Sequence, residues 1–161
     1  MTQRYVLVFF IWGLEVLLGM KERVVLAGFL NGPGGKYEPG KNFIETVKDE
    51  CIVECGLCPN DENLQPSSIL TVEHQKPDGL LEIQIVDIVR VYEFSGKVID
   101  SEEMIGNHWF KIHNLPNEGL HPEKSAWIKD FLLGKDFNIT IEYDSNDNII
   151  RNQIEIWSWL F

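Results

Sequence analysis

The most informative stretch of the chain reads Asn31-Gly-Pro-Gly-Gly-Lys-Tyr-Glu-Pro-Gly-Lys41, and it leads into a segment that ends Asp49-Glu-Cys-Ile-Val-Glu54-Cys-Gly-Leu57. The glycines and prolines of the first part allow a tight, irregular backbone that can approach a phosphate or a metal ion closely. Between the two parts, apolar residues recur at helical spacing and predict a helix over Asn42 to Cys55. Its buried stripe is predicted at Ile44, Val47, Cys51 and Cys55.

The ends of this helix are also marked in the sequence. Asn42 with Glu45 three residues later forms a capping pair, and Gly56 is a C-terminal stop. Within the helix Glu50 and Glu54 are one turn apart, so their carboxylates share a face and repel each other. A hard divalent cation would offset this repulsion in a concave site. The alternative is a solvated acidic helix face.

A competing interpretation of the loop is a phosphate-binding P-loop. The run from Gly35 to Asn42 matches that motif at all but its last position. Asn42 lacks the metal-binding hydroxyl, and no apolar strand runs into Gly35, so we reject this interpretation. A turn-rich loop without chemistry stays open, but it would not explain the acids behind it.

Length and charge limit the class of protein. The chain has 161 residues, of which 44% are hydrophobic, which is enough for one domain, 1–161, with a proper core. The net charge of −11 argues against nucleic-acid and anionic-membrane partners. It does not exclude a nucleotide substrate, because a bound metal reverses the local sign.

The apolar run from Tyr5 to Trp12 is too short to span a bilayer and lacks a small-residue cleavage site. It predicts a first strand and, without a targeting segment, a cytoplasmic protein.

Three cysteines at 51, 55 and 58 invite a zinc or redox interpretation. Since no histidine or fourth cysteine stands nearby, we expect reduced thiols, with Cys51 and Cys55 packed on the buried face of the helix.

The rest of the chain has an α+β pattern. Strands are predicted at Arg4–Trp12, Glu15–Met20, Ser67–His74, Leu80–Phe94, His108–Ile112, Phe137–Tyr143 and Ile149–Trp157. A second helix is predicted at Pro122–Leu133, and Ser145 to Asn148 predicts a hairpin turn.

The opening stretch resembles a degenerate Nudix box over residues 35–57. That pattern is a glycine, five free positions, a glutamate, seven free positions, then Arg-Glu-aliphatic-any-Glu-Glu-any-Gly-aliphatic. In register, the chain retains Gly35, Glu50, Cys51, Glu54, Gly56 and Leu57. It departs from the pattern at three positions, Lys41, Asp49 and Val53.

The resemblance extends to the MutT-type branch of the family, which includes the animal oxidised-purine nucleoside triphosphatases. It is carried by Tyr5-Val-Leu-Val, Val16-Leu-Leu-Gly-Met-Lys21, Asn31-Gly-Pro-Gly-Gly-Lys36, Ser101-Glu-Glu-Met104 and Trp109-Phe110. It implies an α/β/α sandwich with a mixed β-sheet and a single Nudix domain.

The family's metal ligands fall here on Gly34, Glu50, Glu54 and Glu103, with the three glutamates also catalytic and Mg²⁺ or Mn²⁺ as the cofactor. For Glu103 the alternative is an ordinary surface acid. Val53 removes a carboxylate used for further ions, which implies weaker metal binding or fewer metal ions. Lys41 and Asp49 reverse the charges of the glutamate–arginine pair that braces the loop against the helix.

The substrate-binding positions implied by the resemblance are Lys21, Asn31, His121, Glu123 and Lys124. For Lys21 the alternative is a solvent-exposed lysine. His121 replaces an aromatic stacking platform, and Lys124 replaces a hydrogen-bond-accepting acid although an ammonium only donates.

These features predict a metal-dependent hydrolase of nucleoside triphosphates or other nucleoside diphosphate-linked compounds, which releases a nucleoside monophosphate and pyrophosphate. The alternative is a Nudix-fold nucleotide-binding protein with little or no activity. A monomer or a homodimer fits either function.

Overall fold

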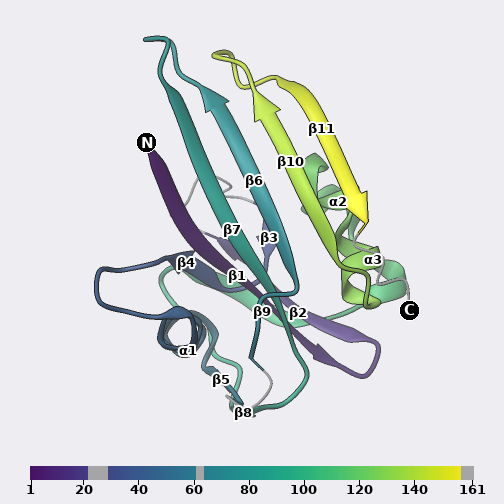
Figure 1. Ribbon diagram of the computed structural model, residues 1–161. Helices are drawn as coiled ribbons and strands as arrows, with labels where there is room; N and C mark the ends of the chain where they lie inside the picture. The colour runs from purple at the N-terminus through teal and green to yellow at the C-terminus, as the bar shows by residue number, and fades with distance from the viewer. Residues whose placement is uncertain (22–28, 61–63, 157–161) are drawn as a thin grey trace, which may run out of the picture.

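The computed structural model describes residues 1–21, 29–60 and 64–156 (Figure 1). The strands are β1 (Thr2–Trp12), β2 (Glu15–Lys21), β3 (Leu30–Asn31), β4 (Gly34–Lys36), β5 (Leu57–Pro59), β6 (Ser68–Gln75), β7 (Leu81–Val91), β8 (Phe94–Gly96), β9 (Met104–Lys111), β10 (Phe137–Tyr143) and β11 (Ile149–Ile156). The helices are α1 (Phe43–Cys55), α2 (Pro122–Ser125) and α3 (Ile128–Leu132), with 3₁₀ turns at Ile112–Asn114 and Asn117–Gly119.

Among the described residues, nine strands form one mixed sheet. Its order is β11-β10-β6-β7-β1-β2-β3, with β4 added to β1 and β9 added to β2. The pairs β1–β7 and β6–β10 are parallel, and the remaining pairs are antiparallel. The strands β5 and β8 form a separate ribbon. This arrangement confirms the predicted mixed sheet.

Helices cover both faces of the sheet. In Figure 1, α1 lies on one side and α2 and α3 lie on the other. Because side chains alternate along a strand, β1 supplies Phe9 to the core under α2 and α3 and Phe10 to the core under α1. The predicted α/β/α sandwich is confirmed, and its first strand anchors both cores.

The main helix, α1, begins and ends as predicted. The Asn42 side chain accepts a hydrogen bond from the backbone N–H of Glu45 at 2.9 Å. Gly56 ends the helix in the left-handed region, with φ of 82°, which a residue with a side chain rarely adopts. The buried stripe differs from the prediction, since Ile44 is only half-buried while Thr46 and Glu54 are also buried.

The prediction for the cysteines is confirmed, since all three thiols are free and the two on α1 are buried. Cys51 and Cys55 are fully buried in the core beneath α1, and both thiols are free. Burial raises the pKa of the Cys55 thiol to about 11 and also raises the pKa of Cys51, so both stay protonated. Cys58 lies in β5 and is partly exposed.

Several predicted elements have different bounds in the structure. The segment Leu80–Phe94 divides into β7 and β8, and Pro122–Leu133 divides into two short helices separated by Ala126 and Trp127. The predicted strand His108–Ile112 begins earlier, at Met104, and Trp157 lies outside the described residues. No helix in the described ranges is long and apolar enough to cross a membrane.

The glycine-rich segment is more regular than we predicted. Its residues Gly34 to Lys36 form β4 and pair with Leu7 to Tyr5 of β1. A Cβ atom on Gly34 would lie 2.1 Å from the carbonyl oxygen of Val6. The glycine is therefore needed for close strand pairing, which an interpretation of glycine as a loop signal misses.

Candidate active site

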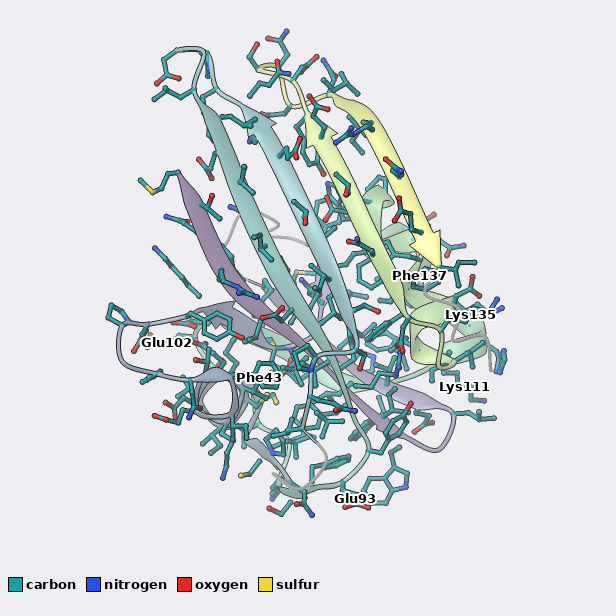
Figure 2. The ribbon with its side chains drawn as sticks, in the orientation of Figure 1. Phe43, Glu93, Glu102, Lys111, Lys135 and Phe137 are labelled. Carbon is teal, nitrogen blue, oxygen red and sulfur yellow. The ribbon has the colours of Figure 1, made fainter. Side chains whose placement is uncertain are left out.

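Three carboxylates from distant parts of the chain meet at one point. Glu50 and Glu54 project from α1, and Glu103 lies directly before β9. One oxygen atom of each lies within 4.8 Å of the others. Figure 2 shows Glu102, the neighbour of Glu103, on the same side of the sheet as Phe43 at the start of α1. The structure thus brings together the three predicted acids.

Hydrogen bonds between side chains and backbone groups position the segment that carries Glu103. The Asp100 carboxylate accepts hydrogen bonds from the backbone N–H groups of Gly106 and Asn107, each at 3.0 Å. The Asn107 side-chain amide donates to the backbone carbonyls of Ile99 at 2.9 Å and of Glu54 at 3.3 Å. Asn107 therefore ties this segment to α1. Sequence reasoning missed it, since an asparagine inside a strand gives no signal of this role.

Glycine residues bring β4 against the acids of α1. A Cβ on Gly35 would lie 2.6 to 2.8 Å from the three carboxyl atoms of Glu50. The backbone N–H of Gly34 donates to Glu54 Oε1 at 3.2 Å. The first glycine of the box pattern thus leaves room for Glu50, and its neighbour binds Glu54.

Lys21 joins the same cluster. Its Nζ atom lies 2.7 Å from Glu54 Oε2, contacts Oε1 as well, and donates to the backbone carbonyl of Gly34 at 3.2 Å. Lys21 is 5% exposed and Glu54 is 1% exposed. The alternative of a solvent-exposed lysine is therefore wrong, because Lys21 forms a buried ion pair with an expected metal ligand.

The electrostatics of the cluster favour a further positive charge. Burial, reinforced by the negative charge of Glu54, raises the pKa of Glu50 to about 7. Burial also raises the pKa of Glu54, while Lys21 opposes this effect. Two carboxylates that resist ionisation next to each other would ionise more readily beside a cation.

The donor set fits a hard divalent ion. It consists of carboxylate oxygens from Glu50, Glu54 and Glu103 and the backbone carbonyl oxygen of Gly34, and Mg²⁺ and Mn²⁺ prefer such oxygen ligands. The Lys21 ammonium already shows that two of these groups accept a cation.

A second group of the predicted site residues lies around α2. His121 caps this helix by accepting a hydrogen bond from the backbone N–H of Glu123, and its ring lies 5.1 Å from that of Phe29. Glu123 is 4% exposed and accepts a hydrogen bond from the hydroxyl of Tyr143. Phe29 and Tyr143 were not among the predicted site residues, since nothing in their local sequence distinguishes them from core aromatics.

Lys124 is an unusual member of this group, because it is 3% exposed. Burial lowers its pKa; Glu123 opposes this effect and Lys21 adds to it. Within the described residues its ammonium makes no hydrogen bond or ion pair. Lys124 therefore stands near two charged groups, the Glu123 carboxylate and the Lys21 ammonium.

Asn31, the remaining predicted substrate residue, lies in β3 opposite Gly19 of β2. Its side-chain oxygen accepts a hydrogen bond from the backbone N–H of Gly32 at 2.9 Å. It is only half-buried. Within the described ranges, the structure shows no direct bond from Asn31 to the groups around α2.

The residues that depart from the box pattern are wholly or partly exposed, with Asp49 and Val53 on α1 and Lys41 just before it. Lys41 Nζ lies 2.8 Å from Asp49 Oδ2 and 3.0 Å from Glu38 Oε2. The predicted charge-exchanged contact is therefore confirmed. Val53 is 61% exposed.

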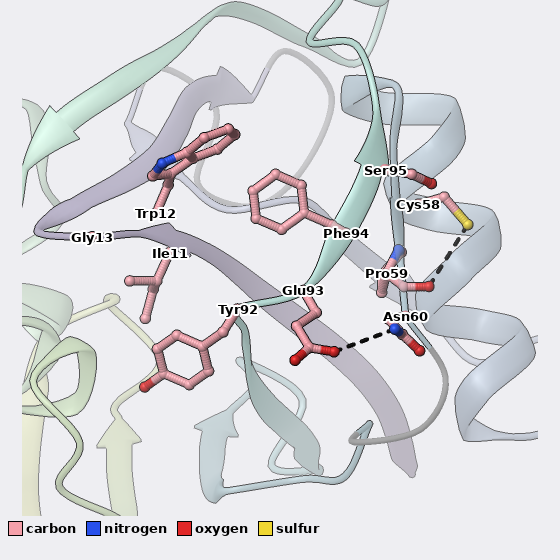
Figure 3. A pocket seen from close by; sticks show the side chains of 10 residues that line it. All are labelled: Ile11, Trp12, Gly13, Cys58, Pro59, Asn60, Tyr92, Glu93, Phe94 and Ser95. Atoms are coloured by element: carbon pink, nitrogen blue, oxygen red, sulfur yellow. Dashed lines mark hydrogen bonds between the residues drawn. The ribbon is translucent and has the colours of Figure 1, made fainter.

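A separate cavity of about 630 Å³ lies at the far end of β1 (Figure 3). Trp12, Tyr92 and Phe94 line it, and the Glu93 carboxylate accepts a hydrogen bond from the Asn60 side chain at 3.3 Å. None of the predicted site residues lines this cavity. It is distinct from the carboxylate cluster.

No protein-family model matches the chain. The chain is similar to the oxidized purine nucleoside triphosphate hydrolase of Mus musculus, with 31% identity over 149 residues that cover 92% of each chain. It is also similar to the protein of that name from Danio rerio, with 28% identity over 141 residues, or 88% of this chain and 86% of the relative.

Solved structures share the fold. The MutT protein of Bacillus halodurans superposes with a TM-score of 0.78 at 24% identity and covers 95% of this chain and 97% of its own. A MutT NUDIX hydrolase from Burkholderia pseudomallei gives a TM-score of 0.61 at 21% identity, over 83% and 96% of the two chains. With a relative 31% identical along nearly its whole length, this chain belongs to the Nudix hydrolase family, and its fold is that of the MutT proteins. Enzymes of this family are metal-dependent pyrophosphohydrolases.

Proposed function

We propose that the protein hydrolyses nucleoside triphosphates to a nucleoside monophosphate and pyrophosphate, with Mg²⁺ or Mn²⁺ held by Gly34, Glu50, Glu54 and Glu103. The observation that carries this proposal is the meeting of three carboxylates within 4.8 Å at the glycine-rich strand β4. Acids that repel each other at this distance are maintained at a cost to stability, which a bound cation would offset.

Each residue has a role that its environment supports. Glu54 is buried and fixed by the N–H of Gly34, so it is the central ligand of the site. Burial and the charge of Glu54 raise the pKa of Glu50 to about 7, and a bound cation would favour its ionised form as a ligand. Glu103 is exposed, which leaves it free to complete the ligand set or to accept a proton from the attacking water. A bound divalent ion supplies charge neutralisation at the phosphates and a more acidic water.

We propose that His121, Glu123 and Lys124 form the base-recognition end and that Asn31 and Lys21 also contact the substrate. The two vertebrate relatives are named for oxidised purine nucleoside triphosphates. An ammonium at the buried position of Lys124 can only donate hydrogen bonds, because it has no acceptor atom. We therefore infer a substrate base with an acceptor edge or an additional anionic group, and a weaker preference for oxidised purines.

The test is Mg²⁺-dependent release of pyrophosphate across a panel of normal and oxidised nucleoside triphosphates. Hydrolysis of at least one member that disappears with EDTA and in Glu54→Gln supports the proposal. Glu45→Gln changes an exposed acid on the same helix and is the matched control. Saturable nucleotide binding without turnover would instead support the alternative of an inactive binding protein.

A further inference from the structure

The ammonium of Lys21 lies among the oxygen atoms that the proposed metal site uses. Lys21 is the last residue of β2, and its side chain reaches Glu54 on α1 and the Gly34 carbonyl on β4. Both carboxylate oxygens of Glu54 contact the same Nζ atom. One lysine therefore bridges two groups that are both expected to bind a divalent ion.

The hydrogen bonds of Glu54 leave little capacity for a second cation. Its Oε1 atom accepts from both the Lys21 ammonium and the Gly34 N–H, and its Oε2 atom accepts from Lys21. A carboxylate oxygen offers about two acceptor sites, so Oε1 is fully used. An ion bound to Oε2 at a Mg²⁺–oxygen distance of about 2.1 Å would also lie close to the ammonium, and the two positive charges would repel.

We propose that Lys21 is a built-in competitor of the divalent ion, whose ammonium neutralises Glu54 in the metal-free protein and must leave Glu54 and Gly34 before these oxygens bind metal. This inference rests on the metal site of the proposed function. It follows that Lys21 weakens the affinity for metal and stabilises the metal-free protein. The exchange involves two cations and one set of ligands, and no covalent bond changes.

The experiment measures Mn²⁺ binding to the full chain, freed of metal, by the loss of the free-ion signal in electron paramagnetic resonance. In Lys21→Met the competitor is absent, so the affinity for Mn²⁺ should rise roughly tenfold or more, because both the occupied acceptor sites and the charge repulsion are removed. Lys41→Met is the matched control. It also removes one lysine charge from an ion pair, but Lys41 lies on the surface and pairs with Asp49 outside the cluster.

Thermal unfolding provides the second measurement. In EDTA, Lys21→Met should unfold at a lower temperature than the parent, because Glu54 loses its buried partner. Saturating Mn²⁺ should then raise the unfolding temperature of Lys21→Met more than that of the parent. If Lys21→Met does not fold, Lys21→Gln retains a hydrogen-bond donor without the charge and is expected to show the same tighter binding. Lys21→Arg retains the charge and should bind Mn²⁺ no more tightly than the parent.

The outcomes separate this inference from the function on which it rests. Equal or weaker Mn²⁺ binding in the neutral variants, with normal binding in the parent, overturns the competitor role and leaves the metal site intact. Absence of saturable binding in the parent and in the neutral variants overturns the metal site itself. Binding that appears only in the neutral variants, or that is clearly tighter in them, supports the competitor role.

Discussion

Two lysine–carboxylate pairs include residues of the Nudix box. They differ in how much of each side chain is exposed to solvent. The Lys21–Glu54 pair is almost completely buried, with side-chain exposures of 6% and 1%. The Lys41–Asp49 pair is open to solvent, with side-chain exposures of 35% and 51%. The buried pair includes a residue that the family pattern requires, whereas the exposed pair consists of two residues that depart from it.

A similar difference in burial separates several residues that match the box pattern from those that depart from it. Cys51, Glu54 and Leu57 match the pattern and are buried, while Lys41, Asp49 and Val53 depart from it and are wholly or partly exposed. An exposed ion pair contributes little, so its charges can be exchanged at small cost. A buried charge that loses its partner is strongly destabilising. The departures from the pattern therefore lie at wholly or partly exposed positions, whereas Glu50 and Glu54 of the carboxylate cluster match it.

The largest effect is expected for Glu54→Gln. The change removes the charge of the central ligand, so hydrolysis should fall by at least roughly 100-fold, since even residues that only support a ligand cost about 10- to 100-fold. It also leaves Lys21 buried without a charge partner, so the melting temperature should fall. Steady-state hydrolysis and thermal unfolding measure the two effects.

A double variant separates these two losses. Lys21→Met with Glu54→Gln removes both buried charges, so it should recover stability but not activity. The matched control is Glu45→Gln on the same helix, which should keep both properties. Parental activity in Glu54→Gln would place the metal site elsewhere and would remove the contrast between the two pairs.

The proposed base-recognition end provides the next test, because its lysine, unlike Lys41, is buried. Lys124 is 3% exposed, so its replacement should change function more than replacement of Lys41. The combined change Lys124→Asp with His121→Trp restores an acceptor and a stacking surface. It should raise the preference for oxidised over normal purine triphosphates by roughly tenfold or more, since buried hydrogen-bonding groups discriminate strongly.

The measurement is the ratio of kcat/KM values for the two substrates. It needs a thermal unfolding control, because the carboxylate introduced at position 124 would lie near that of Glu123. Strong oxidised-purine preference in the unmodified protein would contradict the idea that this end has changed its specificity. Recognition would then depend on Asn31 and Glu123 or on other residues.

The sequence was sufficient to predict local features of the fold and the site residues that the box motif places at fixed spacing. The cap at Asn42, the stop at Gly56 and the hairpin between β10 and β11 depend on neighbouring residues and could be predicted. The burial of Lys21 could not, because it depends on the meeting of β2, β4 and α1. The same is true of Tyr143, whose hydroxyl reaches Glu123 from a strand 20 residues away.

Val53→Glu is expected to have a moderate effect on the metal requirement. It tests whether the exposed face of α1, which carries Val53, affects metal binding. Val53 is 61% exposed, so a glutamate there should fold without difficulty. It lies one turn from Glu50 and next to Glu54 in sequence, so the added carboxylate should lower the Mg²⁺ concentration needed for half-maximal activity by roughly threefold. A Mg²⁺ titration of initial rates measures this. An unchanged metal requirement in the folded variant would show that the outer face does not limit metal binding.

The smallest effect is expected for the exposed pair, and a double-mutant cycle detects it. Lys41→Glu places a new carboxylate next to both Asp49 and Glu38, whereas Asp49→Arg sets only one cation against Lys41. The first single change should therefore lower the melting temperature more than the second. The double variant should recover part of the loss and not all of it, since the two introduced side chains would pair with each other while the new carboxylate would still repel Glu38. This partial recovery is the sign of direct coupling.

High salt should weaken the coupling, because solvent-exposed charges are screened. Strictly additive melting-temperature changes would mean that the contact does not brace the loop against α1, and the tolerance of Lys41 and Asp49 would then reflect only their exposure.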